Sequence, residues 1–308
     1  MKKVFIDGSA GTTGLRIRER LAARTDLALI TLPEEKRKDS AARREALNAA
    51  DIAFLCLPDD AAREAVAMIE NPHTAVIDTS TAHRTAAGWL YGFPELADRA
   101  ALAAAKRIAN PGCHASGFVA LVAPLVRAGL LKSDARLTAF SLTGYSGGGK
   151  KMIAEYEGED RPPVMSAPRQ YALSQKHKHL PEMQAVCGLE VAPIFSPIVA
   201  DYYAGMEVTV PLFADAVKGS VADIAAVYRE VYQNGLVRFS PTMGDGGMLA
   251  GNGMAGRDDM EVGVLGNDER ILLVARFDNL GKGASGAAIQ NMNILLGTDE
   301  AAGLVIGE

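Results

Sequence analysis

The chain has 308 residues, of which 48% are hydrophobic and 22% charged, with a formal net charge of −5. This composition suits about two folded domains, and the mildly acidic balance excludes the strong positive field of a general nucleic-acid binder. No apolar run approaches the ~20 residues of a membrane span, and only three apolar residues precede Asp7, so neither a span nor a secretory leader is expected.

The first third of the chain alternates short apolar runs with helical stretches. Strands are expected at Lys3–Ile6, Leu27–Leu32, Ile52–Leu57, Ala75–Ile77 and Arg107–Ala109, and helices at Leu15–Ala23 and Ala61–Glu70. Unbroken apolar strands separated by helices predict a parallel sheet covered on both faces, which is the doubly wound α/β (Rossmann) pattern.

The pattern of apolar and polar residues changes after about residue 135, where several of the expected strands alternate the two kinds. They are expected at Arg136–Leu142, Val191–Ile198, Met206–Leu212, Glu261–Leu265 and Ile271–Phe277. Glycine-rich loops at 144–149 and 244–256 separate some of them. The pattern predicts a second, mostly antiparallel domain of α+β type. A final helix at Ser285–Leu296 is a candidate to return to the first domain.

A glycine-rich loop follows the first strand and opens the first helix. Glycine permits a tight turn and close approach of the backbone to a pyrophosphate, whose charge the helix N-terminus favours. The expected coenzyme contacts here are Gly8, Ser9, Gly11, Thr12, Thr13 and Gly14. The alternative is a purely structural turn, but the strand–loop–helix context favours a dinucleotide site.

The second strand has no acidic residue at its end to accept a hydrogen bond from the ribose of NAD. The first acid is Glu34, and Lys36, Arg37 and Lys38 follow it. Cations suit the additional phosphate of NADP, so Lys36 and Arg37 are expected to bind NADP, although such a run can also be a solvated loop.

The three cysteines form neither a CxxC pair nor an even set, which argues against a disulfide framework or a zinc ribbon and favours a reducing, cytoplasmic location. Cys56 and Cys187 lie in apolar stretches and are expected to be inert. Cys113 follows Asn110-Pro111-Gly112 and precedes a helical pattern from Ala115 to Gly129, which places it near a helix N-terminus. That position favours the thiolate, so Cys113 is a candidate nucleophile, with a structural cysteine as the alternative.

Two histidines, His177 and His179, form the segment His-Lys-His-Leu-Pro-Glu. One of them is a candidate base for Cys113, a surface pair is the alternative, and no metal site is expected. His114 is set aside as the base because neighbours on a helix do not face each other.

Polar residues also stand where a substrate anion could bind. Ser80 and Arg84 follow the Ala75–Ile77 strand, and ligands bind beyond the carboxyl ends of parallel strands. Lys150 ends the glycine-rich stretch that begins at Gly144. Each can instead be a surface or loop residue.

Taken together, these segments resemble the N-acetyl-gamma-glutamyl-phosphate reductases, in particular their shorter form, and more distantly the aspartate-semialdehyde dehydrogenases. The matching stretches run in order along almost the whole chain: GSAGTTG, FLCLPDDAA, DTSTAHR, YGFPEL, NPGCHASGF, GYSGGGK, HKHLPEM and DNLGKGASGAAIQNMN. The chain has His-Ala-Ser after Cys113, where the longer form has Tyr-Pro-Thr, and HKHLPEM replaces HRHTPEI.

The resemblance implies an NADP-binding Rossmann domain of residues 1–112 and 285–308, and a catalytic and oligomerisation domain of residues 113–284. It implies that Cys113 is the nucleophile, that His179 or His177 is the base, and that Arg84 binds the substrate phosphate. It also places Asn279, Gly281, Lys282 and Gly283 near the nicotinamide.

The activity that it implies is NADPH-dependent reduction of N-acetyl-L-glutamyl 5-phosphate to the 5-semialdehyde through a cysteine thioester, in arginine biosynthesis. A homo-oligomer, dimer or tetramer, is expected, with a small-molecule substrate and neither a nucleic-acid nor a membrane partner. The alternatives are another acyl-phosphate reductase such as an aspartate-semialdehyde dehydrogenase, a Cys/His hydrolase, and a catalytically silent NADP-binding regulator.

Overall fold

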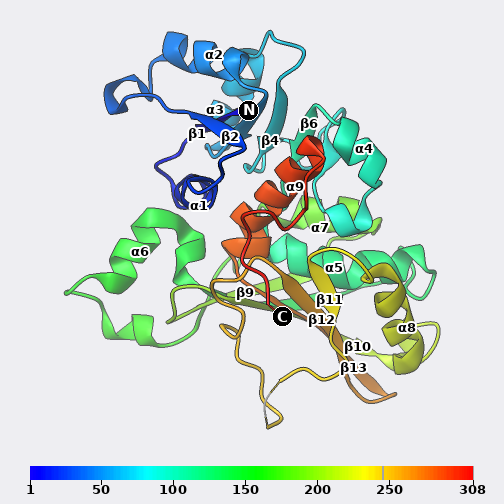
Figure 1. Ribbon diagram of the computed structural model, residues 1–308. Coiled ribbons are helices and arrows are strands. Elements are labelled where there is room, and N and C mark those ends of the chain that lie inside the picture. The colour runs from blue at the N-terminus through cyan, green and yellow to red at the C-terminus, as the bar shows by residue number, and fades with distance from the viewer. Residues whose placement is uncertain (245, 308) are drawn as a thin grey trace. The chain divides into compact units, whose positions relative to one another are not determined.

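The computed structural model describes residues 1–244 and 246–307, which divide into two compact units (Figure 1). The first unit contains Met1–Gly112 and Ala284–Leu304. The second contains Cys113–Gly283 and the residues from Val305 onward.

The chain after Leu304 therefore lies in a different unit from the one that the sequence suggested for residues 285–308. The amides of Val305 and Gly307 donate hydrogen bonds to the carboxylates of Asp258 and Asp259, at 2.9 and 3.3 Å. These bonds attach the tail to the second unit.

The first unit is a parallel six-stranded sheet with strand order β2-β1-β3-β4-β6-β5, which confirms the predicted doubly wound class. Its strands are β1 Lys2–Asp7, β2 Leu27–Ile30, β3 Ile52–Leu55, β4 Ala75–Asp78, β5 Leu90–Tyr91 and β6 Arg107–Ala109. Its helices are α1 Thr12–Leu21, α2 Ser40–Ala49, α3 Asp59–Ala67, α4 Arg99–Ala104 and α9 Gly286–Leu296, with 3-10 turns at Glu34–Lys36 and Pro94–Leu96.

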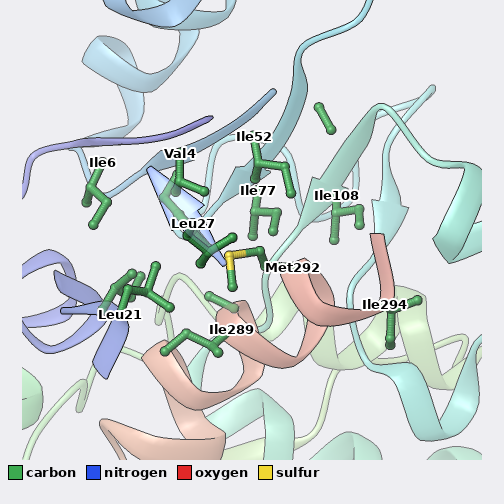
Figure 2. Packing of buried hydrophobic residues seen from close by; sticks show 14 of the residues in the cluster. Val4, Ile6, Leu21, Leu27, Ile52, Ile77, Ile108, Ile289, Met292 and Ile294 are labelled. Carbon is green, nitrogen blue, oxygen red and sulfur yellow. The ribbon is translucent and has the colours of Figure 1, made fainter. Parts of the chain in front are cut away.

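Alternate residues of the central strands enter two separate cores, one on each face of the sheet. Phe5, Ala53 and Val76 pack with residues of α2 and α3. Val4, Ile52 and Ile77 face the opposite core, which includes residues of α1 and α9. Figure 2 shows Ile289 and Met292 of the C-terminal helix among these sheet residues. The last helix therefore completes the first unit.

The sequence analysis missed α2. Its pattern is weak because alanine and charged residues dominate Ser40–Ala49. Asp39 caps it by accepting a hydrogen bond from the amide of Ala42 at 2.7 Å, and Ala46 and Leu47 bury its inner face.

The second unit contains a mixed seven-stranded sheet with strand order β11-β12-β13-β10-β7-β9-β8. Its strands are β7 Thr138–Gly144, β8 Arg169–Gln170, β9 Ile194–Ala200, β10 Met206–Phe213, β11 Val237–Phe239, β12 Met260–Gly266 and β13 Arg270–Phe277. Its helices are α5 Cys113–Arg127, α6 Gly149–Glu157, α7 Leu180–Cys187 and α8 Val221–Val231, with short turns at Tyr145–Gly148, Pro163–Ser166, Ala214–Ala216 and Gly281–Ser285, the last of which runs into the first unit. Most pairings are antiparallel, as predicted, but β7–β9 and β11–β12 are parallel.

Helix α5 packs against β10 and β13 and is buried along almost its whole length. Strand β10 alternates buried and partly exposed residues, so one sheet face meets the helix and the other does not. The glycine-rich stretch expected as a loop at 144–149 is instead a 3-10 turn that leads into α6.

Candidate active site

The loop between β1 and α1 needs glycine at two of its three predicted positions. Gly8 has φ +85°, and a Cβ atom there would lie 2.2 Å from the carbonyl oxygen of Cys56. A Cβ atom on Gly14 would lie 2.4 Å from the carbonyl oxygen of Gly8. Gly11 meets no such clash, and its amide donates to the Gly8 carbonyl at 3.0 Å. The glycines thus allow the loop to fold tightly under the first turn of α1.

Helix α1 begins at Thr12, and no side chain of the described residues caps it at Gly11. The first-turn amides of a helix lack intrahelical partners and carry partial positive charge, which suits a phosphate. Ser9, Thr12 and Thr13 lie in this loop and first turn, partly exposed, where the sequence placed coenzyme contacts.

A cavity of about 680 Å³ opens beside this loop. Residues of β1, the loop, β2 and the segment after it line the cavity, together with Arg18 of α1 and Arg43 of α2. The first group includes Asp7, Gly8, Ser9, Ala10, Thr31, Leu32, Glu34, Glu35, Arg37 and Lys38. The glycine cradle and the several cations fit a nucleotide that carries phosphate groups. Of the two residues predicted to bind NADP, Arg37 lines the cavity and Lys36 is not among its lining residues, which include Lys38.

A buried ion pair forms part of the cavity wall. Arg43 donates to the Asp7 carboxylate through Nε and Nη2, at 3.1 and 2.9 Å. Burial raises the pKa of Asp7, and the opposing attraction of Arg43 does not cancel that effect. The sequence analysis missed this pair because Arg43 lies on the unpredicted helix α2.

Arg84 and Ser80 lie in the loop after β4, as predicted. The Arg84 guanidinium donates to the carbonyl oxygens of Asn110 and Thr79, at 3.0 and 3.1 Å. These bonds to backbone oxygens orient the group. The Ser80 hydroxyl donates to Asp78 at 2.7 Å, and Asp78 also contacts His83 at 2.6 Å.

Cys113 is the first residue of α5, so its predicted place at a helix N-terminus is confirmed. It is partly exposed, as a reactive cysteine must be. Gly283 lies against it, because a Cβ atom at that glycine would be 3.0 Å from the Cys113 Cβ. Any larger residue at position 283 would press on Cys113.

The histidines gather in the same unit as Cys113. The ring centroids of His177 and His179 are 4.7 Å apart, and each lies 5.6 Å from that of His114. His179 is buried and His177 partly buried, so they are not a surface pair. The His179 amide donates to Nδ1 of His177 at 3.2 Å, which occupies a lone pair of that ring.

Two hydroxyl groups that the sequence analysis missed complete this cluster. His114 contacts the Ser141 hydroxyl through Nδ1 and the Tyr171 hydroxyl through Nε2, both at 2.6 Å. Burial, aided by the charges of His177 and Lys178, lowers the pKa of His114 to about 3, so it is neutral. Tyr171 lies only six residues before His177 in the sequence. This closeness to the histidine segment is the one signal that could have identified it.

The remaining predicted site residues are either buried in the second unit or exposed on it. Asn279, Gly281, Lys282 and Gly283 are all buried in the second unit. Asn279 accepts from the Gly205 amide at 2.9 Å and donates to the Ser146 hydroxyl at 3.0 Å. Lys150 is exposed in the first turn of α6.

The other two cysteines are poor nucleophiles. Burial raises the pKa of Cys56 to about 12 and holds the pKa of Cys187 above its usual range. Within residues 1–244 and 246–307, no group of three or more His, Cys, Asp or Glu side chains forms a metal site, and no helix is long and apolar enough to span a membrane.

Two family models match the chain. The model for the NAD binding domain of semialdehyde dehydrogenase matches residues 3–105, and the model for the semialdehyde dehydrogenase dimerisation domain matches residues 113–279.

Curated relatives match over nearly the full length. N-acetyl-gamma-glutamyl-phosphate reductase 2 of Pseudomonas putida is 46% identical, covering 97% of this chain and 98% of the relative. N-acetyl-gamma-glutamyl-phosphate reductase of Sinorhizobium medicae is also 46% identical, covering 96% and 98%.

Among solved structures, aspartate semialdehyde dehydrogenase II of Vibrio cholerae superposes with a TM-score of 0.73 at 17% identity, covering 96% of this chain and 98% of that one. The aspartate semialdehyde dehydrogenase of Candida albicans with NADP superposes with a TM-score of 0.67 at 16% identity, covering 96% and 98%. Likeness at this identity concerns the fold alone.

Proposed function

Because this chain belongs to the N-acetyl-gamma-glutamyl-phosphate reductase family, we propose that it reduces N-acetyl-L-glutamyl 5-phosphate to N-acetyl-L-glutamate 5-semialdehyde with NADPH and releases phosphate. This is a reaction of arginine biosynthesis. The placement of Cys113 at the start of α5, with two histidines of the same unit, His177 and His179, gathered beside its neighbour His114, carries the proposal.

The Cys113 thiolate is the nucleophile of this reaction. Its sulfur forms a bond to the acyl carbon while the bond from that carbon to the phosphate oxygen breaks, and the electron pair leaves with phosphate. The product is a thioester on Cys113. Reduction turns the thioester into a thiohemiacetal on Cys113. Its oxygen then re-forms the carbonyl of the semialdehyde, the carbon–sulfur bond breaks, and the thiolate is restored.

His179 is the proposed base. It takes the proton of the Cys113 thiol before attack and gives a proton to the departing phosphate. His177 is the weaker candidate because its Nδ1 already accepts the His179 amide, which leaves Nε2 to carry the proton in a neutral ring.

The glycine loop at Gly8–Gly14 would hold NADP, and the cations that line the neighbouring cavity, Arg37 among them, would bind its extra phosphate. NADPH supplies the hydride that reduces the thioester. The chain's own contribution is the cradle at Gly8, where a side chain would collide with backbone. Ser9, Thr12 and Thr13 are proposed contacts in the same loop.

The proposed substrate contacts are Arg84 and Ser80, with Lys150 supported only by its charge. The guanidinium of Arg84, oriented by its bonds to two backbone carbonyls, is a cation of the kind that binds a phosphate. Asn279 and the Gly281–Gly283 segment remain proposed contacts of the nicotinamide. The short distance between Gly283 and Cys113 supports a place for that segment near the chemistry.

The protein is further proposed to act as a homo-oligomer, a dimer or a tetramer. One face of the second sheet presents Phe140, Ile194 and Phe213, which are 49%, 61% and 69% exposed. An apolar sheet face of this kind is typical of a subunit interface. A cytoplasmic location fits a reaction that needs Cys113 reduced.

The decisive experiment is the reverse reaction, measured as NADPH formed from N-acetyl-glutamate 5-semialdehyde and phosphate. Cys113→Ala should lower turnover by about 10³-fold or more, since the nucleophile is lost. NADPH binding, followed by its fluorescence, should persist. Cys187→Ala is the matched control and should retain turnover.

Three results would contradict the proposal in different ways. Retained turnover in Cys113→Ala would exclude this nucleophile. Faster turnover with aspartate semialdehyde would favour the other reductase activity. Ester or amide cleavage without NADPH binding would favour a hydrolase.

A further inference from the structure

The Asp78 carboxylate organises the turn that follows β4. It is fully buried at the end of the strand, and its Oδ1 accepts a hydrogen bond from the Ser80 amide at 2.9 Å. Its Oδ2 accepts from the Ser80 hydroxyl at 2.7 Å and lies 2.6 Å from Nδ1 of His83. Because an ionised carboxylate offers only acceptors, Nδ1 of His83 carries the proton of this bond. One carboxylate therefore binds both ends of the turn from Ser80 to His83.

The two carbonyl groups that orient Arg84 are themselves held by Asp78. Nη2 of Arg84 donates to the Thr79 carbonyl at 3.1 Å, and this carbonyl belongs to the same peptide group as the Ser80 amide. A peptide group is planar, so the bond from its amide to the Asp78 carboxylate also fixes the direction of its carbonyl. The other carbonyl is that of Asn110, which accepts from Nε of Arg84 at 3.0 Å, while the amide of Asn110 donates to the Asp78 carbonyl at 2.8 Å.

His83 restrains the same turn from its other end. It directly precedes Arg84 in the chain, and its ring stacks on that of Trp89, with ring centroids 4.0 Å apart and planes 12° apart. The ring is thus held by its face on Trp89 and by its Nδ1 on Asp78. Because His83 and Arg84 are neighbours, fixing the first restricts the backbone from which the guanidinium extends.

We propose that Asp78 and His83 are positioning residues, which hold the Arg84 guanidinium in the orientation that binds the phosphate of the acyl phosphate, or inorganic phosphate in the reverse reaction. This inference rests on the proposed function, in which Arg84 binds that group. A guanidinium that is already oriented loses less conformational entropy when it binds an oxyanion than a mobile one does.

Two substitutions of His83 separate the hydrogen bond from the stacking. His83→Asn keeps an amide N–H donor for Asp78 and loses the ring, whereas His83→Phe keeps a ring against Trp89 and loses the donor. In the reverse reaction, the KM for inorganic phosphate should rise about tenfold in His83→Phe and stay within about threefold of the wild type in His83→Asn. The kcat and the KM for the semialdehyde should stay within about threefold in both variants, because only phosphate binding is weakened.

Asp78→Asn tests the other partner of this bond. It puts an amide N–H where Oδ2 accepts, so the Ser80 hydroxyl and the His83 ring must both rearrange. The KM for phosphate should rise in the same direction. Combined with His83→Phe, it should raise this KM by less than the product of the two single effects, since both substitutions remove one bond. Arg84→Met removes the guanidinium itself and should raise the KM for phosphate about 100-fold or more.

Phosphate affinity measured without turnover gives a second readout. The dissociation constant of inorganic phosphate, obtained from the broadening of its phosphorus NMR signal, should change by the same factors as the KM. Thr74→Val is the matched control, because it removes a buried hydroxyl that donates to the Ala50 carbonyl at 2.8 Å, directly before the other end of β4. It should lower the thermal stability without changing either phosphate constant.

Unchanged phosphate constants in folded His83→Phe would overturn the positioning role, even if the chain reduces the acyl phosphate. An equal loss of phosphate affinity in His83→Asn would also overturn it, because the stacking and not the hydrogen bond would then matter. If His83→Phe does not fold, unchanged phosphate constants in Asp78→Asn would overturn it equally. Turnover that survives Cys113→Ala, or an unchanged KM for phosphate in Arg84→Met, would instead overturn the proposed function in its nucleophile or its phosphate contact.

Discussion

At the scale of single residues, the ion pair of Asp7 and Arg43 links the glycine loop to helix α2. Asp7 is the last residue of β1, directly before Gly8, and both partners are buried. A carboxylate in such a place depends on its cation, since burial alone disfavours the charged form.

Arg43→Met should therefore destabilise the first unit by about 3–5 kcal/mol at neutral pH, because it leaves a buried charge without its partner. The pKa of Asp7 is already raised, and removal of Arg43 raises it further. As the pH falls through that pKa, the protonated carboxyl no longer needs the arginine, so the difference in stability should shrink.

Urea unfolding followed by tryptophan fluorescence can measure this effect, because the single tryptophan, Trp89, lies in the first unit. Adding Asp7→Asn to Arg43→Met should recover part of the loss at neutral pH. A deficit that stays constant between pH 8 and pH 5 would refute the role assigned to Asp7.

At the scale of elements, the C-terminal helix α9 completes a unit that is otherwise formed by the first 112 residues. Its polar residues are also committed to that unit, since Asn291 donates to the Gly92 carbonyl and Gln290 to Glu95, at 2.8 and 2.9 Å. Because α9 is both buried and hydrogen-bonded to this unit, it is one of the helices that cover the first sheet.

Met292→Ala should lower the free energy of unfolding of the first unit by about 2–5 kcal/mol, because Met292 is fully buried and its loss leaves a cavity. The Trp89 signal reports the change even though the substitution lies some 200 residues away in sequence. Leu15→Ala, at a 40% exposed position of α1, should stay within about 0.5 kcal/mol. Equal effects of the two variants would mean that α9 does not support this unit.

At the scale of the whole molecule, the open face of the second sheet is the main candidate for self-association. The strand register puts Phe140 opposite Thr209 and Ser196, and Ile194 opposite Thr138, so both apolar residues share one face. Helix α5 lies against the other face.

Phe140→Lys combined with Ile194→Lys should shift the protein toward the monomer, because each interface would bring like charges together in an apolar contact. Light scattering after gel filtration gives the mass directly. Val191→Lys, at an exposed position just outside β9, is the control and should leave the mass unchanged. An oligomer unaffected by the double substitution would place the interface elsewhere.

Local sequence patterns alone determined many of the strands and turns of this protein. Unbroken apolar runs such as Ile52–Leu55 dictate a parallel sheet, because only strands buried on both faces tolerate them. The glycine spacing at Gly8 and Gly14 and the Pro-Gly before Cys113 likewise identify their turns, since few backbone conformations suit those residues. The predicted parallel sheet and the predicted place of Cys113 at or near a helix N-terminus are confirmed.

Only the tertiary structure decided which distant side chains meet. Ser141 and Tyr171 reach His114 because β7 and the segment before α7 fold onto α5, and no local pattern encodes that contact. The same limit applies to Arg43 on Asp7 and to the tail after Leu304, which joins the second unit through Asp258 and Asp259. Hydrogen bonds between remote residues depend on how elements pack, whereas strands and turns depend on neighbours in the chain.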